Sequence, residues 1–435
     1  MVNWEKVRIG QFLREREGRY RPTDETVRSL KRLDKIDFSG NVYLTDKDSR
    51  TDMIIIEPGD LVISGINVSK GAVAVYYGEE PITATIHYSS YAFDKNRVDI
   101  NYFKRFIKSQ SFAQVLKDQV KGGIKTEIKP KHLLSLEILL PGINKQKETV
   151  SFFDNIEEEI HSMNRSNNHQ RSFITKLRQQ VLQEAVEGKL TAKWRREHPE
   201  LVSGDNHASR LLERIRSKRG HSVKKGKTRK EMAPAGTTGD KRPFELPEGW
   251  TWARFFEVCT IATNGVSPFD YPNHLHVSPD NIDKNTGRLM ECGTVKEKNI
   301  ISVNHLFYPG MLVYSKVRPR LRKIVKVDFE GLCSADMYPL IADCDPDYLK
   351  HVMLSEYFDR EVYRFDNRVK MPKINQDQLN SILIPLAPQA EQLIVSDTIA
   401  TIASVLDELE KQVFERKELT EMLMQSVLRE AFAAS

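Results

Sequence analysis

The chain repeats itself at a fixed distance, and this constrains its fold more than any other feature. Residues 179–186 read QQVLQEAV, and residues 425–432, 246 positions later, read QSVLREAF. The same offset, without a gap, relates residues 128–185 to residues 374–431 at further identities such as Ile156 and Ile402. A repeat that tolerates no insertion over so many residues is typical of a long helix. We therefore expect two copies of one structural unit.

The repeated stretch places apolar residues at alternating steps of three and four, which predicts a coiled-coil seam. One series recurs by sevens through Ile174 and Ile399, and a companion series lies three residues further on. Asn167 and Gln170 interrupt the first copy, where they either fix the register or face water. The predicted seam residues are Ile160, Met163, Ile174, Leu177, Val181, Leu406, Leu409, Leu423 and Val427.

The sequences that precede the two predicted helices also match each other. EPGDLVISGI (57–66) corresponds to YPGMLVYSKV (308–317), which predicts a Pro-Gly turn and then a strand ending in serine. The segments IKPKHLLSLEILLPG and INQDQLNSILIPLAP each predict a short strand before a helix. The predicted fold is therefore α+β, with mixed domains at 1–142 and 246–387 followed by long helices at 143–195 and 388–435.

The two helices bury their seams most simply against each other. Antiparallel pairing puts the two domains at opposite ends, related by a pseudo-two-fold axis, whereas parallel pairing puts both at one end. The join at 196–245 contains RIRSKRGHSVKKGKTRK (214–230), which holds no acidic residue. This composition predicts an exposed basic linker, with a short amphipathic helix at ASRLLERI just before it.

Composition and motifs favour a reader or scaffold over a catalyst. The net charge is only +6, and no apolar run is long enough to span a membrane. The four cysteines form no CxxC pair and the N-terminus has no apolar signal region, so we expect a cytoplasmic protein. There is no GxxxxGK[ST] phosphate loop and no complete [NDS]PP[YF] element. We expect no catalytic residue, no metal and no cofactor, because surface histidines explain His274 and His276 beside Cys292 better than zinc does.

Basic residues gather at matching places in both repeats, after the Pro-Gly strand and before the lead-in strand. The segments are SKVRPRLRKIVK (315–326), RFDNRVKMPK (364–373) and KGGIKTEIKPK (121–131). Such clusters are either solvated surface or phosphate-binding and base-reading loops, and their matching positions favour the second. The candidate DNA-binding residues are Ser64, Asn67, Lys70, Lys121, Gly122, Gly123, Lys125, Ser315, Lys316, Arg318, Arg320, Arg322, Lys323, Arg364, Arg368, Lys370 and Lys373.

Over essentially its whole length the chain resembles the specificity subunit of Type I restriction-modification systems. The resemblance is carried by the duplication, by FELPEGWTWARFFEV (244–258), by LRQQVLQEAVEGKLTAKWRREHPELV (177–202) and by YSKVRPRL with CSADMYPLIA (333–342). The junctions LLPGINKQKETV and IPLAPQAEQLIV also match. One departure is that the first half opens at MVNWEKVRIG without an LPEGW, which leaves the start of its domain open.

The resemblance implies that each domain is a target-recognition domain reading one half of a split, asymmetric site in double-stranded DNA. The helices would form an antiparallel coiled-coil spacer that sets the gap between half-sites and docks two methyltransferase subunits. Those subunits would supply S-adenosylmethionine binding and catalysis, and a separate restriction and translocase subunit would use ATP and Mg. Two alternatives remain, a coiled-coil scaffold without DNA readout and a stand-alone nuclease or methyltransferase with unrecognised motifs.

Overall fold

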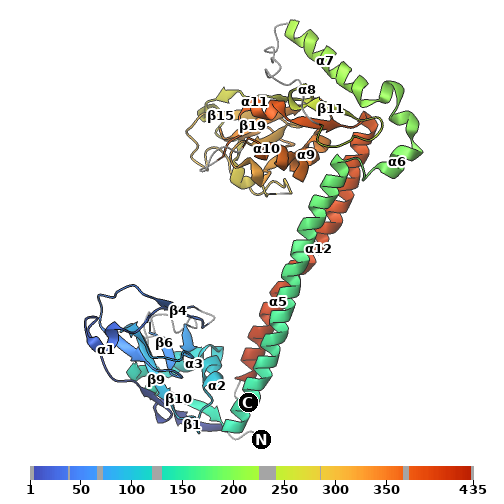
Figure 1. Ribbon diagram of the computed structural model, residues 1–435. Coiled ribbons are helices and arrows are strands. Elements are labelled where there is room, and N and C mark those ends of the chain that lie inside the picture. Colours follow the sequence, from blue (N-terminus) through green and yellow to red (C-terminus); the bar gives the residue numbers. More distant parts are fainter. Residues whose placement is uncertain are drawn as a thin grey trace. The chain divides into compact units, whose positions relative to one another are not determined.

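The computed structural model describes residues 4–37, 40–65, 72–119, 130–224, 242–284, 286–365 and 372–432. The chain divides into two compact units. Unit 1 contains Met1–His169 and Val413–Ser435, and unit 2 contains Gln170–Gln412. Each unit therefore combines one globular domain with the adjoining part of its own long helix and the far end of the other long helix (Figure 1).

The described residues of the globular domain in unit 1 form three sheets. A pair joins β1 (Trp4–Arg8) to β10 (Glu137–Pro141). One four-stranded sheet has the order β2 (Leu13–Glu15), β9 (Tyr88–Phe93), β6 (Leu61–Ser64) and β7 (Val73–Val75). The other has the order β4 (Val42–Thr45), β3 (Arg32–Ile36), β8 (Ile82–Thr85) and β5 (Met53–Ile56).

Most of this plan recurs among the described residues of the globular domain in unit 2. A pair joins β11 (Thr251–Arg254) to β20 (Leu383–Leu386). One four-stranded sheet has the order β12 (Cys259–Ile261), β19 (Met337–Ala342), β16 (Leu312–Ser315) and β17 (Ile324–Lys326). The other has the order β13 (Gly265–Val266), β15 (Asn304–Phe307), β18 (Gly331–Cys333) and β14 (Leu275–Val277). In this last sheet, β14, β18 and β15 correspond to β3, β8 and β5, with the parallel pair β14–β18 equivalent to β3–β8. The remaining strand differs, because β4 lies beside β3 whereas β13 lies beside β15. The shared strands confirm the α+β class and the duplication.

The predicted Pro-Gly turns stand at equivalent positions before β6 and β16. Gly59 has φ +90° and Gly310 has φ +87°, a left-handed conformation that favours glycine. The N–H of Gly59 donates to the carbonyl of Tyr76 at 2.7 Å, and that of Gly310 donates to Val327 at 2.8 Å. The two strands that follow end at Ser64 and Ser315, as predicted.

The last three helices of each globular domain also correspond. Unit 1 has α1 (Glu25–Arg28), α2 (Ile100–Ile107), α3 (Gln110–Gln119) and α4 (Pro130–Ser135). Unit 2 has α8 (Phe255–Val258), α9 (Pro346–Leu354), α10 (Glu356–Tyr363) and α11 (Gln376–Ser381). Asp99 caps the N-terminus of α2 and Asp345 caps that of α9, so the Asp-Pro-Asp-Tyr sequence at residues 345–348 begins a helix.

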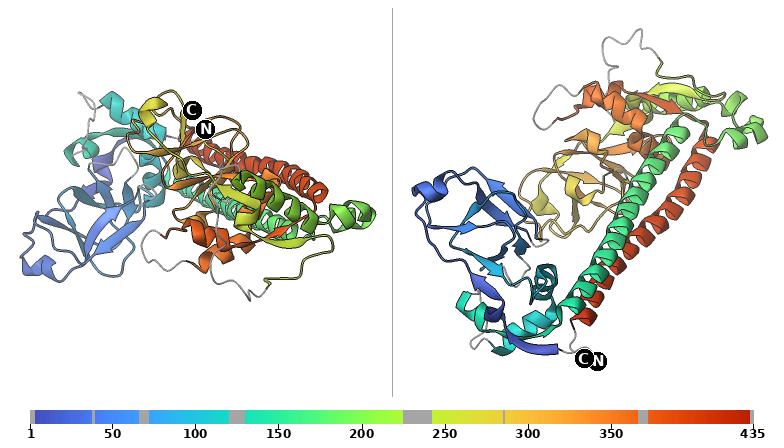
Figure 2. Two further views of the ribbon diagram at one scale, coloured as in Figure 1. Left: turned by 90° about the horizontal axis from the view of Figure 1, so that it is seen from above. Right: turned by 60° about the horizontal axis from the view of Figure 1, so that its bottom comes forward.

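The long helices are α5 (Ile143–Val186) and α12 (Gln389–Ala431), which lie side by side in Figures 1 and 2. In unit 2, Arg178 of α5 forms an ion pair with Asp407 of α12, and Arg195 beyond the end of α5 reaches Glu391 near the start of α12. In unit 1, the ring of Phe153 near the start of α5 stacks on Phe432 at 5.6 Å. The helices are therefore antiparallel, and the parallel alternative is wrong.

The seam between these helices is narrower than predicted. Ile174, Leu406 and Asn167, of the series that recurs by sevens, are buried. Ile160, Val181 and Val427 are half-buried. The companion residues Met163, Leu177, Leu409 and Leu423 are instead 43–49% exposed, which corrects the prediction. A residue three positions along a helix lies about 60° further round it, so a single partner helix leaves that flank open.

The helix after the first domain ends earlier than expected, and much of the predicted linker is folded. Gly188, with φ +67°, follows the end of α5 at Val186, in place of the predicted end at 195. The end of α6 (Ala192–Glu197) and all of α7 (Ala208–Lys224) then occupy 19 of the 50 residues predicted to form the exposed linker. Leu211, Leu212 and Ile215 of α7 are buried in the core of unit 2, which explains its order.

Three of the resemblance motifs meet at one buried carboxylate, Glu391, whose side chain is fully buried on α12. It accepts hydrogen bonds from the Thr191 hydroxyl at 2.6 Å, the Trp250 indole N–H at 2.8 Å and Arg195 at 3.1 Å. Burial raises the pKa of Glu391, although the three donors act in the opposite direction. The motifs LTAKWRRE, LPEGW and PQAEQ therefore form a structural joint in unit 2.

Candidate nucleic-acid interface

A basic loop leaves β16 in unit 2 and turns sharply. Ser315 is buried at the end of the strand, and its hydroxyl donates to the carbonyl of Val317 at 2.9 Å. Arg318 (φ 47°) and Arg322 (φ 50°) then bracket a single 3-10 turn at Pro319–Leu321, both in the left-handed region. Non-glycine residues adopt this conformation at a cost of order 1 kcal/mol, and they cluster at functional sites.

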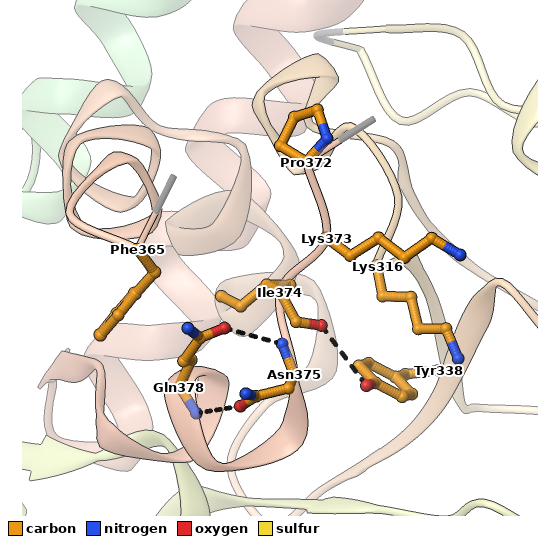
Figure 3. A pocket seen from close by; sticks show the side chains of 8 residues that line it. All are labelled: Lys316, Tyr338, Phe365, Pro372, Lys373, Ile374, Asn375 and Gln378. Atoms are coloured by element: carbon orange, nitrogen blue, oxygen red, sulfur yellow. Dashed lines mark hydrogen bonds between the residues drawn. The ribbon is translucent and has the colours of Figure 1, made fainter. Parts of the chain in front are cut away.

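A second basic segment, at residues 372–375, pairs with this loop through its backbone. The N–H of Ile374 donates to the carbonyl of Lys316 at 3.0 Å, and that of Arg318 donates to Pro372 at 2.9 Å. Two clusters separated by some fifty residues in the sequence are therefore brought together, which the basic pattern alone did not specify (Figure 3).

A hollow of about 430 Å³ opens between the two segments (Figure 3). The ammonium of Lys316 lies 5.1 Å from the centre of the Tyr338 ring, and Lys373 Nζ lies 3.0 Å from Asp336 Oδ1. Tyr338 is buried, and burial raises the pKa of its hydroxyl. The lining residues are Lys316, Tyr338, Phe365, Pro372, Lys373, Ile374, Asn375 and Gln378.

Two amides on α11 are fixed at the edge of this hollow. Asn375 Oδ1 accepts from the N–H of Gln378 at 2.8 Å, and Gln378 Oε1 accepts from the N–H of Asn375 at 3.0 Å. This capping box holds both side chains by their oxygens, and among the described residues neither NH₂ group has a hydrogen-bond acceptor. Amide and carboxylate side chains can read base edges, and lysines can bind phosphates.

The arginines near the hollow lie in different surroundings. Arg318 is exposed, and among the described residues its side chain has no hydrogen-bond or ion-pair partner. Arg320 lies 3.6 Å from Asp359 and 4.8 Å from the centre of the Tyr363 ring. Arg364, also a candidate, is exposed and forms an ion pair with Glu361 at 2.8 Å.

Two other candidates are half-buried and paired within unit 2, which favours a structural role for them over contact with DNA. Arg322 donates to Gln179 of α5 and, at 3.2 Å, to the carbonyl of Leu354. Lys323 donates to the carbonyl of Pro279 at 2.6 Å, and its side chain is only 15% exposed. Their partners lie far away in sequence, so the local basic pattern does not distinguish them from Arg318.

In unit 1 the structure describes fewer of the candidates. Ser64 is buried at the end of β6, and its N–H donates to the carbonyl of Ala72 at 3.1 Å. Several predicted residues lie outside the described ranges, namely Asn67, Lys70, Lys121, Gly122, Gly123 and Lys125, together with Arg368 and Lys370 of unit 2.

The basic pattern missed Tyr338, Asp336, Asn375 and Gln378, because they are not cationic. Their signals were present in other forms. Tyr338 lies in the quoted CSADMYPLIA segment, and Asn375 with Gln378 has the spacing of a capping box.

The described residues contain no group of three or more His, Cys, Asp or Glu side chains arranged to hold a metal ion. His276 Nε2 lies 3.1 Å from Asn304 Oδ1, and burial lowers the pKa of this histidine. Within the described ranges, no helix is both long and apolar enough to cross a membrane.

The known proteins to which this chain is similar include specificity subunits of Type I restriction enzymes. The Type I restriction enzyme EcoDI specificity subunit of Escherichia coli is 30% identical over 302 residues, covering 69% of this chain and 62% of that relative. The EcoKI specificity subunit of Escherichia coli (strain K12) is 33% identical over 132 residues, 30% of this chain and 28% of the relative. The match therefore spans less than two thirds of the EcoDI subunit's length. No protein-family model matches.

Two solved structures share the fold over nearly the whole chain. A chain from work on complex assembly and conformational transition of the type I R-M system has a TM-score of 0.64 at 13% identity, covering 99% of this chain and 98% of that one. The HsdS subunit from Thermoanaerobacter tengcongensis has a TM-score of 0.53 at 15% identity, covering 99% and 96%.

Proposed function

Because this chain belongs to the family of Type I restriction enzyme specificity subunits, we propose that it reads DNA sequence for a Type I restriction-modification complex. Each globular domain reads one half of a split site in double-stranded DNA. The two domains share most of their strand plan but differ in an edge strand and in their loops, so the two half-sites differ in sequence. The paired helices act as the spacer between them.

The observation that carries this proposal is the surface formed by Lys316, Arg318 and Lys373 around the hollow of unit 2. Lysine and arginine neutralise phosphates, while the amides of Asn375 and Gln378 supply donors for base edges. These groups come from two segments, residues 316–318 and 373–378, which backbone hydrogen bonds hold together, and a capping box fixes the two amides. A preformed surface of this kind suits sequence readout rather than chemistry on a substrate.

The exposed flanks of the long helices support partner docking. Phe152 and Met163 of α5 in unit 1 are 52% and 43% exposed, and Phe173 and Leu177 of α5 in unit 2 are 56% and 48% exposed. Repeated apolar side chains on a helix flank suit protein contacts. We assign two methyltransferase subunits to these flanks, with restriction and translocase subunits joining the complex. S-adenosylmethionine, ATP and Mg belong to those subunits, and this chain is non-catalytic.

Modified-base sequencing tests the proposal directly. DNA is taken from cells that express this chain with its methyltransferase subunit, and the methylated motif is determined. We expect a split, asymmetric motif with a fixed gap. A contiguous or palindromic motif would contradict the two-reader proposal. No motif, with a methyltransferase that is active beside another specificity subunit, would favour the scaffold function instead.

A further inference from the structure

Two arginines of the globular domain in unit 2 reach the long helices. Arg288, on the loop after β14, forms an ion pair with Asp407 of α12. Arg178 of α5 pairs with the other oxygen of the same carboxylate and lies 3.4 Å from Glu410. One carboxylate thus links the globular domain, α5 and α12 within unit 2. Hydrogen bonds between ionised groups are about twice as strong as neutral ones.

The second arginine belongs to the basic loop itself. Arg322 ends the left-handed turn that carries Arg318 and Arg320, and its guanidinium donates to Gln179 of α5 and to the carbonyl of Leu354. Gln179 is buried, so this contact is shielded from water. The loop that presents the exposed cations is therefore fastened to a helix at its far end.

Apolar packing at this junction is incomplete. A hollow of about 60 Å³ lies between the globular domain and the helices of unit 2, lined by Arg178, Thr286, His351, Ile399 and Leu406 among others. A void removes contacts that side chains would otherwise make. The apolar core that Leu182, Ala185 and Ile399 of the helices share with the domain holds the domain in place, and Arg288 and Arg322 add directional polar contacts to it.

We infer that Arg288 and Arg322 are positioning residues, which fix the direction in which the recognition domain of unit 2 stands on the helix pair. This inference rests on the proposed function, because the direction matters when two half-sites must be read across a fixed gap. Rotating a domain on its helices shifts its base contacts along or around the duplex. The two arginines therefore determine how strictly the complex selects the gap, without reading bases themselves.

The test measures gap selectivity in the assembled complex. This chain, with its methyltransferase subunit, methylates synthetic duplexes that carry both half-sites of the wild-type motif at the native gap or at gaps one base pair shorter or longer. The variants are Arg288→Met, Arg322→Met and Gln179→Leu, the last of which removes the acceptor of Arg322 without changing the basic loop. Arg210→Met is the matched control, since Arg210 is an exposed arginine of α7 whose ion pair with Glu213 stays on its own helix.

We expect the preference for the native gap over the altered gaps to fall about fivefold or more in each variant, the equivalent of losing one moderate contact. Arg210→Met retains the wild-type preference, and Arg288→Lys, which keeps a cation for Asp407, restores most of it. Unchanged gap preference in folded variants, even with lower total methylation, would overturn the inference. Changed half-sites would also overturn it, because the arginines would then be reading bases.

Failure of the proposed function and failure of the positioning role give different results. Wild-type complex that gives no split motif would refute the proposed function itself. A split wild-type motif with gap selectivity untouched by Gln179→Leu and Arg288→Met would refute only the positioning role. Thermal unfolding of each complex separates loss of folding from loss of selectivity, and the preference ratio is compared at equal amounts of native-gap methylation.

Discussion

Gln392 of α12 accepts a hydrogen bond from the backbone N–H of Asp345 at 2.8 Å and donates to the carbonyl of Ala387 at 2.7 Å. Gln146 of α5 makes the same two contacts in unit 1, with Asp99 at 2.8 Å and Pro141 at 2.7 Å. Both glutamines are fully buried. Each fastens the start of a long helix to the cap of the helix that follows the sheet, so the duplicated glutamine is a structural joint.

Replacing either glutamine should destabilise its own unit. Gln392→Ala leaves a buried N–H and a buried carbonyl without their partner, which costs ~2–4 kcal/mol. Urea unfolding, followed by circular dichroism, should show a lower midpoint. Gln412→Ala, on the exposed face of the same helix, is the control and should shift stability by less than about 0.5 kcal/mol. Equal shifts of the urea midpoint in Gln392→Ala and Gln412→Ala would mean that the hydrogen bonds of Gln392 contribute no stability.

The coiled-coil seam contains a buried asparagine that weakens it. Asn167 is 2% exposed, and neither atom of its amide has a hydrogen-bond partner among the described residues. Asn167→Leu should therefore raise the free energy of unfolding by ~1–3 kcal/mol, since an unsatisfied buried group is removed. The adjacent Asn168 is exposed, so Asn168→Leu is the matched control. A destabilised Asn167→Leu variant would show that the amide has a favourable partner.

Acid should weaken unit 2 through His351. Burial, reinforced by the neighbouring Lys350 ammonium, lowers the pKa of His351 to about 4, and its Nδ1 has no partner among the described residues. The unfolded chain takes up a proton near pH 6.5, whereas the folded chain does so only near pH 4. This contribution to stability is thus complete above pH 6.5 and is lost as pH falls toward 4, by at most ~3 kcal/mol.

The measurement for this prediction is the unfolding midpoint at several pH values between 4 and 7.5. His351→Leu should flatten the decline, because no proton can bind at that position. His161→Leu, a change of an exposed histidine on α5, should leave the slope as in the wild type. If the unfolding midpoint falls equally with pH in the wild type, His351→Leu and His161→Leu, groups other than His351 cause the acid sensitivity.

DNA binding should respond differently to the cations that the structure separates. Arg318→Ala and Lys316→Ala each remove one phosphate contact, so the salt slope of the logarithm of affinity should fall by about 0.9. Fluorescence anisotropy of the methyltransferase complex with a labelled duplex, over a range of salt concentrations, gives this slope. Lys193→Ala on α6, where Lys193 is 83% exposed, is the control. An unchanged slope for Lys316→Ala would remove the hollow from the DNA surface, and an unchanged slope for Arg318→Ala would remove the exposed arginine of the basic loop from it.

The sequence by itself determined the elements and their order. The fixed offset predicted two equivalent units, the three-and-four spacing predicted α5 and α12, and the Pro-Gly pattern predicted β6 and β16. These features are local, because helix periodicity and turn conformation depend on neighbouring residues. The basic pattern likewise located the loop that carries Lys316 and Arg318.

Tertiary structure alone decided which side of each element is covered. Met163 and Leu177 fit the helical repeat as well as Ile174 does, yet a single partner helix leaves them exposed. Arg318 and Arg322 stand four residues apart in one basic loop, but Gln179, 143 positions away from Arg322, takes up the second and not the first. The physical reason is that burial and pairing depend on what packs against a side chain, and that neighbour comes from a distant part of the chain.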